Sequence, residues 1–107
     1  MTGDDEPSFL RARCPLTGVR AKTVAMCVIA AQRHHGAEIV PVAGAPLEEQ
    51  IARTADNVRR AVAMLCARHP AAAYLQRART AVEASETFCV AVALSADDIE
   101  ARRASRN

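Results

Sequence analysis

Apolar positions recur at alternating steps of four and three residues through the middle of the chain, and this spacing predicts a packed helix. The repeat follows Pro46 and continues to about Arg68. Proline is favoured in a first helical turn, because the N–H that it lacks would have no partner there. The positions of the repeat are Leu47, Ile51, Thr54, Val58, Ala61 and Leu65. We therefore expect a helix over about 46–68.

A second repeat of the same period follows His69-Pro70. Its positions are Leu75, Ala78, Val82, Ser85, Cys89 and Val92. Proline removes a backbone donor and moves the preceding residue out of the α region, so the helix should break there. We expect a second helix over about 70–94, folded back on the first as an αα-hairpin. One long helix kinked at Pro70 is the alternative, since both repeats share a heptad phase, and 88–94 also fits a strand.

The N-terminal third predicts one further helix, from about Arg20 to His35. Apolar residues lie on one stripe of this helix, and Gly36 stands where a C-terminal glycine cap belongs. A buried strand over 23–30 is the alternative, because periodicity does not separate the two for a short apolar run.

The remaining segments predict minor elements. Ser95 followed by acidic residues is typical of a helix N-terminus, which predicts a short C-terminal helix to about 103. Residues 8–14 and 38–42 are expected to form a minor two-stranded β element, with Pro41 confining the second strand to a sheet edge. The class expected is mostly α, with an acidic disordered leader over 1–7 and a single helical domain over 8–107.

Composition limits where the protein works. The longest apolar runs, 24–31 and 88–94, are much shorter than the roughly 20 residues of a membrane span. The first residues are acidic and do not form a secretory signal. The four cysteines then indicate reduced thiols rather than a disulfide framework. We expect a cytoplasmic protein that does not associate with a membrane.

No spacing typical of a catalytic, cofactor or metal site is present, so we expect no enzyme activity, no cofactor and no metal. Segment 17–23 lacks the glycine spacing of a phosphate loop. Zinc sites usually use close cysteine pairs, and here only Cys66 with His69 and Cys27 with His34 share a helical face. A zinc-stabilised or thiol-reactive protein is a distant alternative. Cys14, directly before Pro15, is expected to carry the most exposed thiol.

Nearly all of the positive charge of the chain comes from arginine. Of the fourteen basic residues only Lys22 is a lysine, and arginine is favoured at interfaces. The arginines expected to contact a partner are Arg53, Arg59, Arg60 and Arg77. Glu49 with Arg53 and Asp56 with Arg60 have the i,i+4 spacing of helical ion pairs.

Rows of arginines raise a second possibility, a small nucleic-acid-associated regulator. The cations considered for this role are Arg11, Arg13, Arg20, Lys22, Arg33, Arg53, Arg59, Arg60, Arg77 and Arg79. Rows of cations are what phosphate contacts require. The net charge of only +2 and the three aromatic residues argue against it. The expected function is therefore non-catalytic binding of a protein partner by an adaptor, regulator or inhibitor, acting as a homodimer. A phage or mobile-element inhibitor of host machinery is one such protein.

Overall fold

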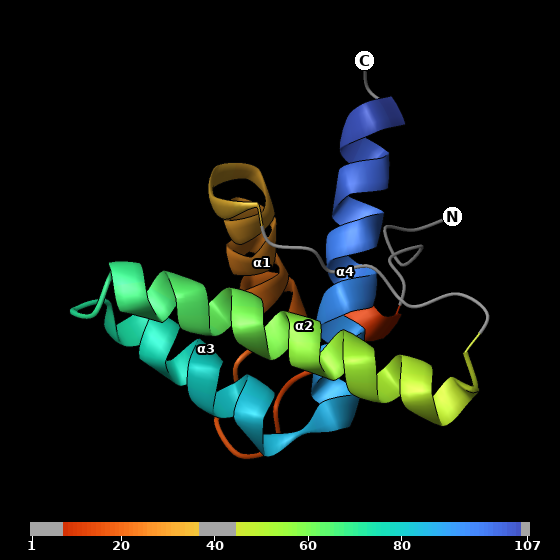
Figure 1. The fold of residues 1–107 in the computed structure, drawn as a ribbon, viewed down its shortest axis with the longest axis horizontal. Coiled ribbons are helices and arrows are strands. Elements are labelled where there is room, and N and C mark those ends of the chain that lie inside the picture. Colours follow the sequence, from red (N-terminus) through yellow and green to blue (C-terminus); the bar gives the residue numbers. More distant parts are fainter. Residues whose placement is uncertain (1–7, 37–44, 106–107) are drawn as a thin grey trace.

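The computed structural model describes residues 8–36 and 45–105, and most of these residues are helical. A short 3-10 helix, η2 (Ser8–Arg11), precedes α1 (Ala21–His35), α2 (Leu47–Arg68), α3 (Ala73–Ala84) and α4 (Glu86–Ser105) (Figure 1). Within the described ranges the only β pairing is an isolated antiparallel bridge between Arg13 and Arg20. The mostly α class predicted from the sequence is confirmed.

Helices α2 and α3 form the predicted αα-hairpin. Figure 1 shows α3 running back alongside α2, and the two helices are in contact. The turn between them contains Pro70, and the N–H of Ala72 donates to the carbonyl oxygen of His69 at 3.0 Å. The alternative of one kinked helix is wrong, and the second helix begins at Ala73 rather than at Pro70.

The second helix of the hairpin is shorter than predicted, because the chain breaks at Ser85. This residue is extended, with φ −148° and ψ 120°. Its hydroxyl oxygen accepts a hydrogen bond from the N–H of Phe88 at 3.1 Å, so Ser85 caps the helix that follows. Beyond the break, α4 turns away and crosses the hairpin (Figure 1). The predicted helix over 70–94 is therefore two helices.

The predicted C-terminal helix starting at Ser95 is also wrong. Helix α4 continues through Ser95 to Ser105 without a break. The Ser95 side chain is 0% exposed, and its hydroxyl lies 2.7 Å from the carbonyl oxygen of Ala91 and 3.3 Å from that of Phe9. A serine that bonds to the carbonyl four residues earlier is compatible with a helix interior.

The first helix forms as predicted, and the strand alternative over 23–30 is wrong. Gly36 ends α1 at φ +69°, a left-handed conformation that glycine adopts without a Cβ clash. Residues 8–14 contain η2 rather than a strand. The proposed partner strand over 38–42 and the acidic leader over 1–7 lie outside the described residues.

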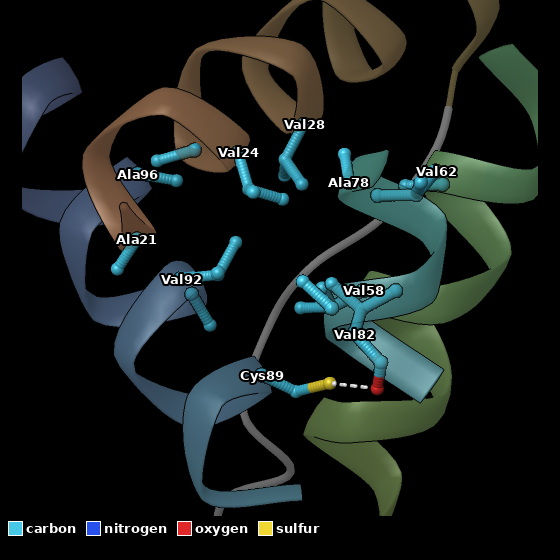
Figure 2. Close-up of a cluster of buried hydrophobic side chains, with 14 of the residues drawn as sticks. Ala21, Val24, Val28, Val58, Val62, Ala78, Val82, Cys89, Val92 and Ala96 are labelled. Atoms are coloured by element: carbon cyan, nitrogen blue, oxygen red, sulfur yellow. Dashed lines mark hydrogen bonds between the residues drawn. The ribbon is translucent and has the colours of Figure 1, made fainter. Parts of the chain in front are cut away.

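Small side chains from all four helices make up much of the core. Figure 2 shows valine and alanine side chains of α1, α2, α3 and α4 meeting between the helices. Small side chains allow close helix approach but bury little area each. Every buried side-chain nitrogen or oxygen of the described residues has a hydrogen-bond partner. The fold therefore combines a thin core with complete polar pairing.

Candidate functional site

A hollow of about 210 Å³ lies between the first half of α2 and the middle of α4. Its apolar lining includes Leu47 and Ile51 of α2 and Val90 and Leu94 of α4. We call these four residues and the space between them the α2–α4 groove. The two helices that form the groove cross each other (Figure 1).

The groove exists because the apolar stripe of α2 is longer than the core that covers it. Val58 and Leu65, later on the stripe, are buried, whereas Leu47 is 70% exposed. On α4, Leu94 is 43% exposed. The other large exposed apolar side chains of the described residues, Leu16, Met26 and Tyr74, do not line this hollow. Clustered exposed apolar side chains are typical of binding surfaces, and single ones are not.

The two helices that form the groove carry three acidic residues near its apolar positions in sequence. Asp97 lines the groove, and Glu86 lies on the same stripe of α4, one turn before Val90. Glu48 follows Leu47 in the first turn of α2. None of the three acids forms an ion pair with a described residue. Asp97 therefore places a negative charge in the lining of the groove, and Glu48 and Glu86 lie on the helices that form it.

One cation beside the groove, Arg33, pairs with an acid other than Asp97. Arg33 lines an adjoining hollow together with Asp97. Its guanidinium nitrogen, however, lies 3.2 Å from a carboxylate oxygen of Glu100. Arg33 therefore pairs within the chain rather than across the groove.

The four arginines predicted as partner contacts are in different environments. The guanidinium of Arg53 pairs with Glu49 at 2.6 Å, as the i,i+4 spacing predicts. Arg59 donates from Nε to the carbonyl oxygen of Val82 at 2.8 Å, so it holds α2 and α3 together. Arg60 and Arg77 are exposed and form no ion pair with a described residue.

The second predicted ion pair of α2 forms differently. Asp56 lies 4.0 Å from Arg59, three residues on, instead of pairing with Arg60. The same Arg59 side chain also donates from Nε to the Val82 carbonyl on α3. The sequence spacing identified the acid but not its partner.

Three of the four cysteine thiols are buried in the fold. The prediction that Cys14 is the most exposed thiol is wrong, since Cys14 is buried and Cys27 is half-buried. Burial raises the pKa of the Cys14 thiol, but hydrogen bonds from Thr17 and the backbone of Leu16 together outweigh it, so this pKa is lowered. The buried Cys66 thiol donates to the carbonyl oxygen of Leu75 at 3.3 Å. The buried Cys89 thiol donates to the carbonyl oxygen of Val82 at 3.0 Å (Figure 2).

The other three thiols have raised pKa values, and the described residues offer no group of metal ligands. Burial raises the pKa of Cys27, of Cys66 and, to about 11, of Cys89, which favours the unreactive neutral thiol. Across 8–36 and 45–105, no three His, Cys, Asp or Glu side chains are grouped so that they could hold a metal ion. Cys66 and His69 are therefore not joined by a third possible ligand among the described residues.

The chain matches no protein-family model, no curated protein and no solved structure. In the part of the chain that the structure describes, no helix has the length and apolar composition that crossing a membrane requires. The α2–α4 groove was missed by sequence reasoning, although its signal is present. Leu47 and Ile51 belong to the predicted seam, and only the tertiary arrangement leaves this end of the seam exposed.

Proposed function

We propose that this protein is a non-catalytic interaction protein, an adaptor, regulator or inhibitor, that binds a basic amphipathic helix of a partner protein in the α2–α4 groove. The observation that carries the proposal is the exposed apolar lining of the groove, with Leu47 70% and Leu94 43% exposed. Leaving such side chains in water costs free energy that a partner recovers by covering them.

The shape and charge of the groove favour this partner. A space between two helices accepts a third helix whose apolar residues recur at steps of three and four. Asp97 lines the groove, and Glu48 and Glu86 lie on the two helices that form it; none of the three pairs with a described residue, so basic side chains beside the partner's apolar stripe complement them. Complementary charge speeds encounter and excludes acidic competitors.

A second copy of the chain fits the groove less well. In a two-fold symmetric dimer the same patch meets itself. The acids of one α2–α4 groove would then face the same acids of the other, and like charges in contact cost several kcal/mol. The homodimer predicted from the sequence stays a prediction, and it requires a surface other than this groove.

The location predicted from the sequence is retained in the proposal. We propose a cytoplasmic protein, because its four cysteines are free and three of them are buried as thiols. A reducing compartment keeps such thiols in this form.

Fluorescence anisotropy with a labelled peptide tests the proposal. The probe is a helical peptide of leucine and lysine with leucines on one stripe, and the comparison peptide has glutamate in place of lysine. We expect the basic peptide to bind at least about tenfold more tightly. We also expect the double variant Leu47→Gln, Leu94→Gln to lose about tenfold or more in affinity for it.

The matched control is the double variant Leu16→Gln, Met26→Gln. These residues are 72% and 47% exposed, against 70% and 43% for the groove pair, and they lie on other elements. The control should bind the basic peptide like the unmodified protein. Equal losses in the two double variants, or equal affinity for the two peptides, would overturn the proposal. Sedimentation showing a dimer that only the groove variant dissociates would replace the partner helix by a second copy.

A further inference from the structure

A second hollow, of about 390 Å³, lies where the chain enters α1. Its lining is almost entirely cationic: Arg11, Arg13, Arg20 and Lys22, with Leu10 as the apolar member. Residues 8–36 contain no aspartate or glutamate. This basic hollow is separate from the α2–α4 groove, and the inference drawn from it does not rest on the proposed function.

The backbone holds the basic hollow in place. Arg13 and Arg20 face each other across the isolated antiparallel bridge. The N–H of Cys14 donates to the carbonyl oxygen of Val19 at 2.9 Å, and Gly18 closes the turn at φ +74°. The Arg13 guanidinium also donates to the carbonyl oxygen of Gly18 at 3.2 Å. The cationic side chains therefore start from a fixed frame, which lowers the entropy lost when a ligand binds.

Three of the four cations that line the basic hollow form no ion pair with a described residue. Arg13, Arg20 and Lys22 form no ion pair within the described ranges, whereas arginines on α2, α3 and α4 do. Like charges held close together repel, and an anion between them removes the repulsion. The cluster therefore has a net attraction for a multivalent anion.

The first turn of α1 adds to this attraction. It contains no acidic residue, and its N-cap position is taken by Arg20, with no side-chain hydrogen bond to the cap. The positive end of the helix dipole therefore has no carboxylate from the first turn of α1 beside it. The cations and the helix terminus act on the same side of the α1 entrance.

We propose that the basic hollow binds linked phosphate groups, with Arg20 and Lys22 as principal contacts. Arginine's planar fork matches phosphate oxygens, and lysine adds a point charge. Several cations around one compact hollow suit a chain of phosphates better than a single carboxylate. The site works by charge and is not a glycine-rich phosphate loop, since Leu16 and Ala21 occupy the glycine positions of that motif. The phosphates come either from a free polyphosphate or nucleotide, or from consecutive backbone groups of a nucleic acid.

Isothermal titration calorimetry of the full chain with inorganic tripolyphosphate tests this site, at low salt of about 50 mM where phosphate contacts are strongest. We expect binding with a Kd below about 1 mM, and at least about tenfold weaker binding of orthophosphate. The double variant Arg20→Glu, Lys22→Glu should lose the tripolyphosphate heat. The control, Arg60→Glu with Arg77→Glu, makes the same change in net charge elsewhere and should lose no more than about threefold.

Equal losses in the two double variants would reduce the effect to net charge and overturn the proposal, as would absence of tripolyphosphate binding by the unmodified protein. A second measurement needs no variant. Adding tripolyphosphate should shift the backbone amide resonances of Lys22 and Thr23 in a ¹H–¹⁵N correlation spectrum. Shifts confined to other helices would contradict the site.

The two phosphate sources are separated by competition. A single-stranded oligonucleotide that displaces tripolyphosphate, and whose binding the Arg20→Glu, Lys22→Glu variant abolishes, identifies a nucleic-acid backbone as the source. Displacement by a nucleoside triphosphate but not by the oligonucleotide identifies a free phosphate compound. Oligonucleotide binding that depends on Arg60 and Arg77 while tripolyphosphate does not bind would contradict the proposal.

Discussion

Val92→Ala and Leu94→Ala are expected to have very different effects on stability, although the two residues are only two positions apart on α4. The Val92 side chain is 0% exposed and lies in the cluster of small side chains in Figure 2. The Leu94 side chain is 43% exposed and lines the α2–α4 groove. If the groove is a binding surface rather than part of the core, only the first substitution should weaken the fold strongly.

The magnitude for Val92→Ala follows from its burial. Removing two buried methyl groups costs about 1.6 kcal/mol of transfer free energy. A cavity of roughly 40 Å³ adds about 1 kcal/mol at 24 cal/mol per Å³. The better helix propensity of alanine returns about 0.5 kcal/mol. The net loss is about 2 kcal/mol, a large fraction of the total stability of a domain of this length.

The loss for Leu94→Ala should stay below about 1 kcal/mol, since much of its side chain is in contact with water in the unbound protein. Urea denaturation followed by far-UV circular dichroism measures both losses, with the m-value checked for constancy. For a domain of this size the Val92→Ala loss corresponds to a fall in Tm of roughly 10 °C. Equal losses for the two variants, or a larger one for Leu94→Ala, would refute the assignment of Leu94 to an open surface.

Three further predictions concern single interactions. Burial raises the pKa of Cys89 from its ordinary 9.0 to about 11, so the folded state keeps the proton longer than the unfolded chain. Stability is then full below pH 9 and falls as the pH rises to about 11, by about 1–2 kcal/mol after allowing for screening, and urea midpoints against pH should show a smaller fall in Cys89→Ala. Arg59→Met removes the hydrogen bond to the Val82 carbonyl and should cost about 1–2 kcal/mol by urea denaturation, whereas Arg60→Met should stay within about 0.5 kcal/mol. Gly36→Ala, with an open environment but φ +69°, should lower stability by about 1 kcal/mol, and Gly36→Asn should cost less in the same assay.

The hairpin shows what periodicity predicts well. The seam over 47–65 is a real helical stripe, and Val58 and Leu65 are buried as it indicates. Leu75, Val82 and Val92 are buried as well, although they lie on two helices rather than one. A single extended residue at position 85 reorients the chain and leaves apolar positions facing the core on both sides of the break. The apolar pattern alone therefore does not reveal the break.

Ser85 and Ser95 show why the start of the last helix was predicted wrongly. Ser85 and Ser95 both precede acidic residues, and both are compatible with a helix N-terminus. Ser85 is the cap, because its hydroxyl accepts from the N–H of Phe88. The hydroxyl of Ser95 instead finds carbonyl partners at Ala91 and Phe9, the second of which lies far away in the sequence. Choosing between the two serines requires the tertiary structure.

The candidate site depends even more on tertiary structure. Nothing in the spacing of Leu47 and Ile51 distinguishes them from the buried members of their seam. The way in which α4 crosses α2 leaves Leu47 70% exposed (Figure 1). Of the predicted arginines, Arg53 and Arg59 are engaged inside the chain. The i,i+4 spacing predicts the pairing of Arg53 with Glu49, but the hydrogen bond from Arg59 to the Val82 carbonyl on α3 depends on the fold.

The central claim is that the α2–α4 groove binds a basic amphipathic helix, and a ¹H–¹⁵N correlation spectrum recorded with the leucine–lysine peptide tests it most directly. The account predicts that the largest shifts fall on the amides of Leu47, Ile51, Val90 and Leu94, with Leu16 nearly unchanged. Shifts centred on the α1 entrance or on the exposed face of α3, with the four groove amides unmoved, would contradict it.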